Sequence, residues 1–465
     1  MNSALVSQRS FLSGGNRVKT ARKEPLPDQY RVAVEAATGS RPAGVTLPKY
    51  MSTIDVSPVL SIDRLTAIAT GRSSSMFLED WTNRIDELHE KTDRRRVLVL
   101  GGAGSIGAST VYLLSRFDLA CLHVVDHNEN ALAELVRDLR SRAAGLHVKD
   151  FRALPLDFGS PVMKRHIGTE KPYDLVFNFA ALKHVRSEKD VCSVLQMFET
   201  NLLKPLRCWR WLLDRGSSPS YFSVSTDKAA EPANLMGASK RLMEHIMFCP
   251  GGPMAMADRI TSSRFANVAF SNGSLLESFI HRFEKRQPIA APSNTLRFFV
   301  SLAEAGQLCV LAAVCGPDRH IMIPRLNLRD HTRKLEEIAA AFIRDQGVEP
   351  RIYLEGQEAR QNLADDLLHD RYPLLLTPLD TQGEKGCEIF VSPQEEAIEC
   401  GMSNILAVRY QGVEPQCLSD FIRSIEAFVS SSDVLVEKRD IVNTVSRLVP
   451  EFSHVESSRM LDERM

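Results

Sequence analysis

The sequence lacks the features that mark several large classes of protein. Its 57 lysines and arginines are balanced by 58 aspartates and glutamates, so no net charge draws it to nucleic acid or to an anionic membrane. The longest apolar runs, such as LCVLAAVC at 308–315, are far too short to cross a bilayer. Its nine cysteines form no CxxC pair and follow no metal-ligand spacing with histidine. We therefore expect reduced thiols, no metal, no nucleic-acid partner and no membrane span.

The N-terminal segment lacks the apolar stretch of a secretory signal, so the expected location is cytoplasmic. Its first sixty or so residues are rich in Ser, Pro, Gly and basic side chains, and no acid precedes Glu24. We predict that residues 1–74 form a poorly ordered basic arm, which is a plain tail or serves an oligomer. An organelle transit peptide is the alternative interpretation. Residues 75–92 carry apolar side chains at helical spacing and predict an amphipathic helix.

Strands and helices then alternate along the chain. The expected strands, each followed by a helical or polar segment, are RRVLVLGG, CLHVVD, DLVFNFAA, YFSVST and ITSSRFANVAF. This alternation predicts an α/β fold with a Rossmann-like, doubly wound parallel sheet. We assign a cofactor-binding domain with its leading helix to residues 75–270. A smaller mixed substrate-binding lobe and a C-terminal extension occupy residues 271–465, where the chain interleaves with the core and helices are expected near 331–346 and 417–430.

A glycine-rich loop follows the first strand and precedes the first helix of this alternation. The loop, GGAGSIG at 101–107, fits both G-x-G-x-x-G and its GxxGxxG variant. Glycine lets the backbone turn tightly and approach a pyrophosphate, which then lies at the helix N-terminus. The predicted cofactor contacts here are Gly101, Gly104, Ser105, Ile106 and Gly107.

The cofactor is predicted to be NAD. Asp126 ends the second strand about twenty residues beyond the glycines, where an acid binds the ribose hydroxyls and repels a 2′-phosphate. A structural turn with a surface aspartate is the alternative. Asp157 and Phe158, after a third strand, are expected to contact the adenine or to be structural. Ala180 and Ala181, at the end of the DLVFNFAA strand, are also placed against the cofactor.

The segment VSTDKAAEPANLMGASK at 224–240 predicts the reaction centre. The strand that ends here brings Thr226, Asp227 and Lys228 to the carboxyl edge of the sheet, where an adjacent acid and base suit proton transfer. Many nicotinamide enzymes carry a tyrosine four residues before a lysine. Lys240 holds the lysine position and is expected to bond the nicotinamide ribose, but Met236 holds the tyrosine position and cannot move a proton. Surface-loop and helix-surface roles are the alternatives for these charged residues.

Several motifs together resemble the bacterial nucleotide-sugar 4,6-dehydratases, which are extended short-chain dehydrogenases/reductases acting on UDP-N-acetylglucosamine. The resemblance covers roughly residues 75–465, and the motifs that carry it are GGAGSIG, VVDHNENAL, FNFAALKHVRSEKD, STDKAAEPANLMGASK, RFANVAFSNGSLL, LRFFVS, YPLLLTPLDTQGEKGCEIF and FSHVESSRMLDERM. The last two resemble the soluble, legionaminic-pathway branch. Several members of the family have methionine at the position of Met236, so this residue does not by itself imply a dead enzyme.

The resemblance implies a role for each residue of the reaction centre. Thr226 would bond the C4 hydroxyl, Lys228 would remove the C5 proton and Asp227 would protonate the departing C6 hydroxyl. The acceptor of the C4 hydroxyl proton is left open between Asp227 and water. The substrate-binding residues are expected to be Lys183, His184, Met236, Asn267 and Arg297. A structural role is the alternative for His184 and Arg297, and Asn201 is expected to order the backbone behind the site.

Two other functions fit the same sequence. A nucleotide-sugar 4-epimerase would share the C4 oxidation but would need no acid–base pair at C5 and C6. A non-catalytic NAD-binding protein would account for Met236 and the basic arm. The sequence leaves open a GDP-linked substrate and the stereochemistry at C5, with a weak preference for retention, and the protein is expected to be a homo-oligomer.

Overall fold

The computed structural model describes residues 63–142, 146–183, 188, 190–378, 388–430 and 436–454. Predicted features outside these ranges, including His184 and residues 1–62 of the arm, lie outside the described residues. No helix of the described part combines the length and apolar character needed to cross a membrane.

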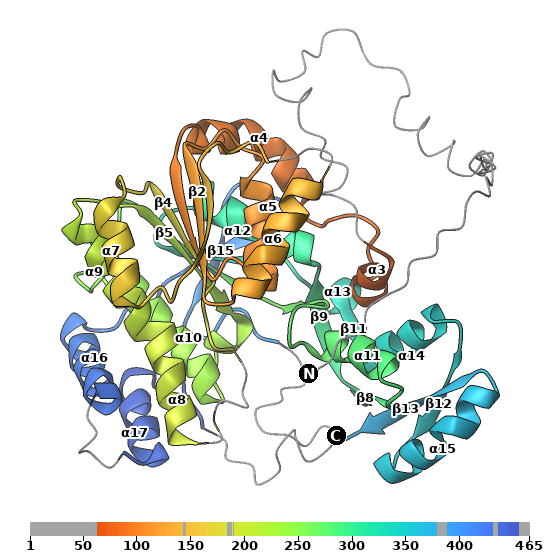
Figure 1. Cartoon of the computed structure of the whole chain (residues 1–465). Coiled ribbons are helices and arrows are strands. Elements are labelled where there is room, and N and C mark those ends of the chain that lie inside the picture. Colours follow the sequence, from red (N-terminus) through yellow and green to blue (C-terminus); the bar gives the residue numbers. More distant parts are fainter. Residues whose placement is uncertain are drawn as a thin grey trace, which may run out of the picture. The chain divides into compact units, whose positions relative to one another are not determined.

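The central sheet has nine strands within the described residues (Figure 1). In spatial order they are β14 (Glu396–Glu399), β15 (Ile405–Arg409), β10 (His320–Pro324), β6 (Ile260–Phe265), β5 (Ser220–Thr226), β4 (Leu175–Asn178), β1 (Arg96–Leu100), β2 (Cys121–Asp126) and β3 (Phe151–Pro155). The strands from β3 to β10 pair in parallel, whereas β15 and β14 are antiparallel additions. The order 3-2-1-4-5-6 is that of a doubly wound dinucleotide-binding fold, as predicted.

Helices cover both faces of this sheet (Figure 1). Alternate strand residues point to opposite faces, so Val97 and Val99 join one apolar core and Leu98 and Leu100 the other. The first core is shared with α4 (Leu78–Thr92), α5 (Ser105–Leu114), α6 (Glu129–Ser141) and α12 (Leu302–Val314). The second is shared with α7 (Pro161–Thr169), α8 (Val191–Phe198), α9 (Lys204–Asp214), α10 (Leu235–Phe248), α16 (Pro415–Ser430) and α17 (Lys438–Leu448). The helix predicted for residues 75–92 is confirmed as α4.

A smaller lobe forms around a second sheet. Its parallel strands are β8 (Ile289–Pro292), β13 (Arg371–Thr377) and β12 (Glu349–Tyr353), and its helices are α11 (Leu275–Glu284), α14 (Leu335–Asp345) and α15 (Gly356–Leu368). A short three-stranded sheet, in the order β11 (Thr332–Lys334), β9 (Leu296–Val300) and β7 (Asn267–Val268), follows the end of β6, and α13 (Leu328–His331) precedes β11. The predicted helices near 331–346 and 417–430 correspond to α14 and α16.

The structure differs from the predicted N-terminal arm at one helix. Part of the predicted arm forms α3 (Arg64–Thr70), whose first turn is capped by the Asp63 carboxylate and whose Ala69 is buried in the core of the smaller lobe. A capped helix with an apolar face is ordered by packing, which the polar composition of the arm concealed. Beyond residue 270, β10, β15 and β14 join the central sheet, as the expected interleaving requires. Helix α12 packs on the same sheet and buries each residue from Glu304 to Val314.

Candidate functional site

The phosphate loop is held in a tight turn at the carboxyl end of β1. Gly101 adopts a φ of +71°, and a Cβ there would lie 2.4 Å from the backbone nitrogen of Ala180. A Cβ on Gly107 would lie 2.5 Å from the Gly101 carbonyl oxygen. Gly104 caps α5, and Ser105 begins it. Only glycine fits at positions 101 and 107. The backbone can therefore approach a ligand at the start of α5.

A cavity of about 460 Å³ lies against this loop. The size suits a nucleotide-sized ligand. Seven of the predicted cofactor residues line it, namely Gly101, Gly104, Asp126, Asp157, Phe158, Ala180 and Ala181. Residues drawn from the ends of β1, β2, β3 and β4 therefore meet at one cavity, although Ser105, Ile106, Gly107 and Lys240 are not among its lining residues.

Asp126 closes the cavity at the end of β2. Its carboxylate accepts hydrogen bonds from the backbone N–H of Ala103 at 3.1 Å and of Asn128 at 3.0 Å. The side chain is largely buried, and its neighbour is the exposed imidazole of His127, with Nδ1 at 3.5 Å. The Asp126 carboxylate is thus held in place, and none of the next three residues is an arginine. This arrangement suits a ribose with two free hydroxyls.

Asp157 and Phe158 form the next wall of the cavity, together with Lys204. The Lys204 ammonium donates to the Asp157 carboxylate at 2.6 Å and lies 6.0 Å from the Phe158 ring centroid. Although burial favours the neutral acid, the bonds from Lys204 and from the Gly159 N–H hold the pKa of Asp157 below its usual value. Sequence analysis did not identify Lys204, which opens α9 far from either partner along the chain.

The segment after β4 is fixed by Asn201, as predicted. The Asn201 side chain accepts from the Leu182 N–H at 2.8 Å and donates to the Leu182 carbonyl at 3.0 Å. Asn201 lies in a π-helical turn, Glu199–Leu203, a feature often found at functional sites. Lys183 is exposed and donates to the Asn272 carbonyl at 2.7 Å, which places it beside the loop that follows β7.

Thr226, Asp227 and Lys228 form a connected group at the end of β5. The Thr226 hydroxyl donates to Asp227 Oδ1 at 2.8 Å. The Lys228 ammonium lies 3.2 Å and 3.3 Å from the two Asp227 oxygens. The Asp227 side chain is 7% exposed and that of Lys228 is 39% exposed, so the pair has a buried acid and an accessible base. Because β5 pairs with β4, this group lies at the same edge of the sheet as Ala180.

Helix α10 packs directly behind this pair. Gly237 makes the close approach possible, since a Cβ there would lie 2.6 Å from the Lys228 carbonyl oxygen. Met236 is buried in the apolar core, and its backbone N–H donates to the Glu188 carboxylate at 3.0 Å. Lys240 is buried and donates to the Val224 carbonyl of β5 at 2.9 Å. Burial lowers the pKa of Lys240 to about 8, against the opposing effect of the Glu244 charge.

The predicted substrate residues Asn267 and Arg297 converge on Glu388, which sequence analysis did not identify. Glu388 Oε1 accepts from the Asn267 amide and lies 3.4 Å from Arg297 Nε. Burial raises the pKa of Glu388, and the nearby Asp227 charge adds to this effect. Arg297 therefore has a carboxylate partner, and a second acid lies close to the Asp227–Lys228 pair. The motif CEIF contains Glu388, but no spacing in the sequence relates it to Asp227.

Arg264, the first residue of the RFANVAFSNGSLL motif, has a structural role. Its guanidinium is fully buried and bonds the carboxylates of Glu244 and Glu395 at 2.6–2.9 Å. It also donates to the Phe390 carbonyl at 2.7 Å. Arg264 thereby joins β6, α10 and the segment 388–395, which contains Phe390 and Glu395.

The sequence matches a known family over most of this fold. Residues 97–407 match the family model described as "Polysaccharide biosynthesis protein". An uncharacterized membrane protein of Methanocaldococcus jannaschii is 31% identical over 259 residues, which are 53% of this chain and 73% of the relative. The probable polysaccharide biosynthesis protein EpsC of Bacillus subtilis is 27% identical over 51% of this chain. That match spans only 39% of EpsC itself.

Two further matches are to a named enzyme and to a solved structure. A UDP-glucose 4-epimerase of Rickettsia canadensis is 27% identical over 50% of this chain and 66% of its own length. The X-ray structure of Pen from Bacillus thuringiensis aligns with a TM-score of 0.53 at 18% identity, covering 72% of this chain and 98% of Pen. This structural similarity supports the Rossmann-like fold.

Proposed function

Because the chain belongs to the polysaccharide biosynthesis protein family, we propose that it is a nucleotide-sugar 4,6-dehydratase. The proposed substrate is UDP-N-acetylglucosamine, or a GDP-linked sugar, and the product is the 4-keto-6-deoxy sugar nucleotide. The observation that carries this proposal is the Asp227–Lys228 pair, a buried acid in contact with an accessible base at the end of β5. Elimination of water across C5 and C6 needs one group to take a proton and another to give one.

The cavity fits NAD. Gly101 and Gly107 leave room for a pyrophosphate at the start of α5, and Asp126 is fixed where the ribose hydroxyls would lie. Bound NAD would supply reversible hydride transfer. The Lys240 ammonium, held on the Val224 carbonyl, is the group of this chain that we place at the nicotinamide ribose.

Transfer of a single proton from Lys228 to Asp227 would convert both residues to the forms that the reaction needs. In the ion pair, the proton is on Lys228 and the Asp227 carboxylate accepts it. Transfer of that proton gives a neutral amine that can remove the C5 hydrogen and a carboxylic acid that can protonate the C6 hydroxyl. The proton taken from C5 and the hydroxide lost from C6 balance as one water. The Thr226 hydroxyl, which donates to Asp227 Oδ1, is free to turn toward the C4 hydroxyl instead.

The second function to consider is a nucleotide-sugar 4-epimerase, because of the 27% identity to the Rickettsia enzyme of that name. An epimerase needs a group that exchanges the C4 hydroxyl proton. The thioether of Met236 is buried and has no exchangeable proton, and Asp227 and Lys228 would have no role at C5. The mass of the product distinguishes the two reactions, since only dehydration removes water.

The test is proton NMR of the purified chain with UDP-N-acetylglucosamine in D₂O. We expect a new C6 methyl signal, deuterium at C5 and the loss of one water by mass. Asp227→Asn and Lys228→Met should each lower kcat by about 10²–10⁴-fold, the usual contribution of a general acid or base. Lys334→Met, the same change at a partly exposed lysine of the smaller lobe, should leave kcat unchanged.

Three results would contradict the proposal. A product of unchanged mass with inverted C4 would identify the epimerase. Turnover that survives both Asp227→Asn and Lys228→Met would remove the pair from the mechanism. The absence of any product with both UDP- and GDP-linked sugars, while NAD remains bound, would identify a non-catalytic binding protein.

A further inference from the structure

A second group of chemically reactive side chains lies at the amino ends of strands β2 and β3, opposite the carboxyl ends that adjoin the cofactor cavity. Cys121 is the first residue of β2, and Asp150 immediately precedes β3. The cofactor cavity adjoins the other ends of these strands, roughly 16 Å away for five residues of extended chain. Nothing in the proposed reaction uses this group.

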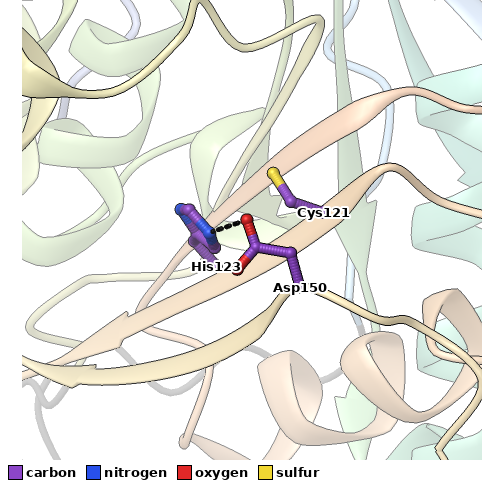
Figure 2. A group of neighbouring side chains, drawn as sticks. All are labelled: Cys121, His123 and Asp150. Carbon is purple, nitrogen blue, oxygen red and sulfur yellow. Dashed lines mark ion pairs between the residues drawn. The ribbon is translucent and has the colours of Figure 1, made fainter.

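Pairing of β2 with β3 brings the three residues of the group together. Cys121 and His123 are two residues apart in β2 and therefore point to the same face of the sheet. The Leu122 N–H donates to the Asp150 carbonyl at 3.0 Å, which sets Asp150 across from Cys121. A sulfur, an imidazole nitrogen and a carboxylate oxygen then lie within 4.8 Å of one another. Figure 2 shows the three side chains together.

The imidazole of His123 has one nitrogen in use and one without a hydrogen bond. Nδ1 lies 2.7 Å from the Tyr173 hydroxyl, which is itself 3.0 Å from His166 Nε2. Nε2 is fully buried and makes no hydrogen bond within the described residues; it lies 3.4 Å from Asp150 Oδ2. That distance is long for a hydrogen bond. It matches the roughly 3.3 Å that separates two ligands of one tetrahedral zinc ion with bonds of about 2.0 Å.

We propose that Cys121 Sγ, His123 Nε2 and Asp150 Oδ2 form a binding site for a zinc-like divalent cation. A thiolate, an imidazole and a carboxylate are the ligands that Zn²⁺ takes in proteins, whereas Mg²⁺ and Ca²⁺ prefer oxygen alone. On binding, the Cys121 thiol loses its proton to solvent and the thiolate bonds the cation.

The surroundings allow entry and orient the ligands. The Asp150 side chain is 35% exposed, which opens the site to solvent and leaves the fourth position to water. The hydrogen bond to Tyr173 fixes the His123 ring, as outer-shell partners of metal-bound histidines do. Arg152 bonds Asp150 Oδ1 at 2.9 Å and Oδ2 at 3.3 Å, so the cation must replace the longer contact. The Glu170 carboxylate accepts a hydrogen bond from the Arg152 guanidinium at 2.8 Å and offsets its charge.

This geometry gives the cation a structural role, because β3 is the edge strand of the sheet. A cation held by β2 and by the residue before β3 would tie that edge to its neighbour. The sequence did not reveal the site, since Cys121 and His123 match no metal-binding spacing and Asp150 joins them only through strand pairing.

The test uses Co²⁺ as a spectroscopic probe on the full-length chain after treatment with a chelator. We expect one Co²⁺ per chain, with the charge-transfer absorption of a cobalt–thiolate bond, and displacement by Zn²⁺. Cys121→Ser should abolish that absorption. Asp150→Asn, at a partly exposed position, should weaken binding at least tenfold. Tyr173→Phe should weaken it by about 10–100-fold while the absorption remains, as expected for an outer-shell partner.

Cys192→Ser is the matched control, because it removes an exposed thiol outside the group. Its spectrum and stoichiometry should equal those of the unmodified chain. The site is refuted by the absence of a thiolate band, by a band that survives Cys121→Ser, or by a band that Cys192→Ser removes. Because Asp150→Asn keeps the core intact, unchanged Co²⁺ affinity in that variant would also refute it. None of these readouts depends on the proposed enzymatic activity.

Discussion

At the scale of single residues, Lys240 is a charged group of the predicted site that is fully enclosed by the fold. Its ammonium is enclosed between α10 and β5 and has the Val224 carbonyl as its close oxygen partner, at 2.9 Å. A carbonyl dipole offsets only part of the solvation that the ammonium loses, so the pKa falls to about 8 from 10.5. A lysine retained in such a place is poised to change its charge near neutral pH, which is the range where acid–base chemistry operates.

The depressed pKa of Lys240 predicts how stability depends on pH. Between about pH 8 and 10.5 the unfolded chain keeps the Lys240 proton and the native chain has released it, so rising pH favours the native state. Relative to Lys240→Met, the unmodified chain should gain about 3 kcal/mol of unfolding free energy across that window. Urea unfolding of both proteins at each pH measures this, and other titrating groups cancel in the difference. Parallel curves would mean that Lys240 keeps its ordinary pKa.

At the scale of elements, the turn between β1 and α5 depends on two of its glycines and tolerates change at a third. Cβ atoms at Gly101 and Gly107 would overlap backbone atoms at 2.4 Å and 2.5 Å, so neither neighbour can move aside cheaply. A Cβ at Gly104 would meet the Gly101 carbonyl oxygen at 3.5 Å, an ordinary contact, and its φ of −69° suits any residue. The close approach of this turn to the residues after β4 thus depends on Gly101, and its close approach to α5 depends on Gly107.

Gly107→Ala and Gly104→Ala form a matched pair that tests this geometry. Gly107→Ala should push α5 away from the Gly101 carbonyl and destabilise the chain by roughly 1–3 kcal/mol, the usual cost of overpacking. It should also weaken NAD binding, because the loop widens. Gly104→Ala should change the unfolding free energy by less than about 0.5 kcal/mol. Urea unfolding and calorimetric titration with NAD measure both effects; equal losses in the two variants would show that backbone contact is not the cause.

The same elements show what can be predicted from the sequence. The glycine loop, the acid at the end of β2 and the TDK segment at the end of β5 each follow an apolar strand, so their positions at one sheet edge follow from the alternation of strands and helices. Asn201 was placed correctly behind the site. The sequence analysis did not identify Lys204 and Glu388, because their partners Asp157 and Asn267 are far away along the chain. The residues next to Lys204 and Glu388 in the sequence form no motif that would mark them. The helical character of α3 was missed because its apolar face is short.

At the scale of the whole molecule, one buried ion network joins parts that are far apart in the sequence. Arg264 in β6 bonds Glu244 in α10 and Glu395 in the segment after residue 388. Arg241 of α10 also contacts Glu395. Glu388 belongs to the same stretch, 388–395, and its carboxylate lies near Asp227, so the network connects the central sheet to the surroundings of Asp227.

Removal of the Arg264 guanidinium should therefore affect both stability and the site. Arg264→Met leaves two fully buried carboxylates without their main partner and should cost about 3–5 kcal/mol of unfolding free energy. Arg325→Met is the matched control, because Arg325 pairs with Glu399 on the surface and its loss should cost no more than about 1 kcal/mol. Chemical denaturation of both variants measures the difference. Proteolysis of the native Arg264→Met protein should begin in the segment around Glu388, because that segment loses its anchor to β6 and α10. Similar losses in the two variants would mean that the network is solvated and does not hold the segment against the sheet.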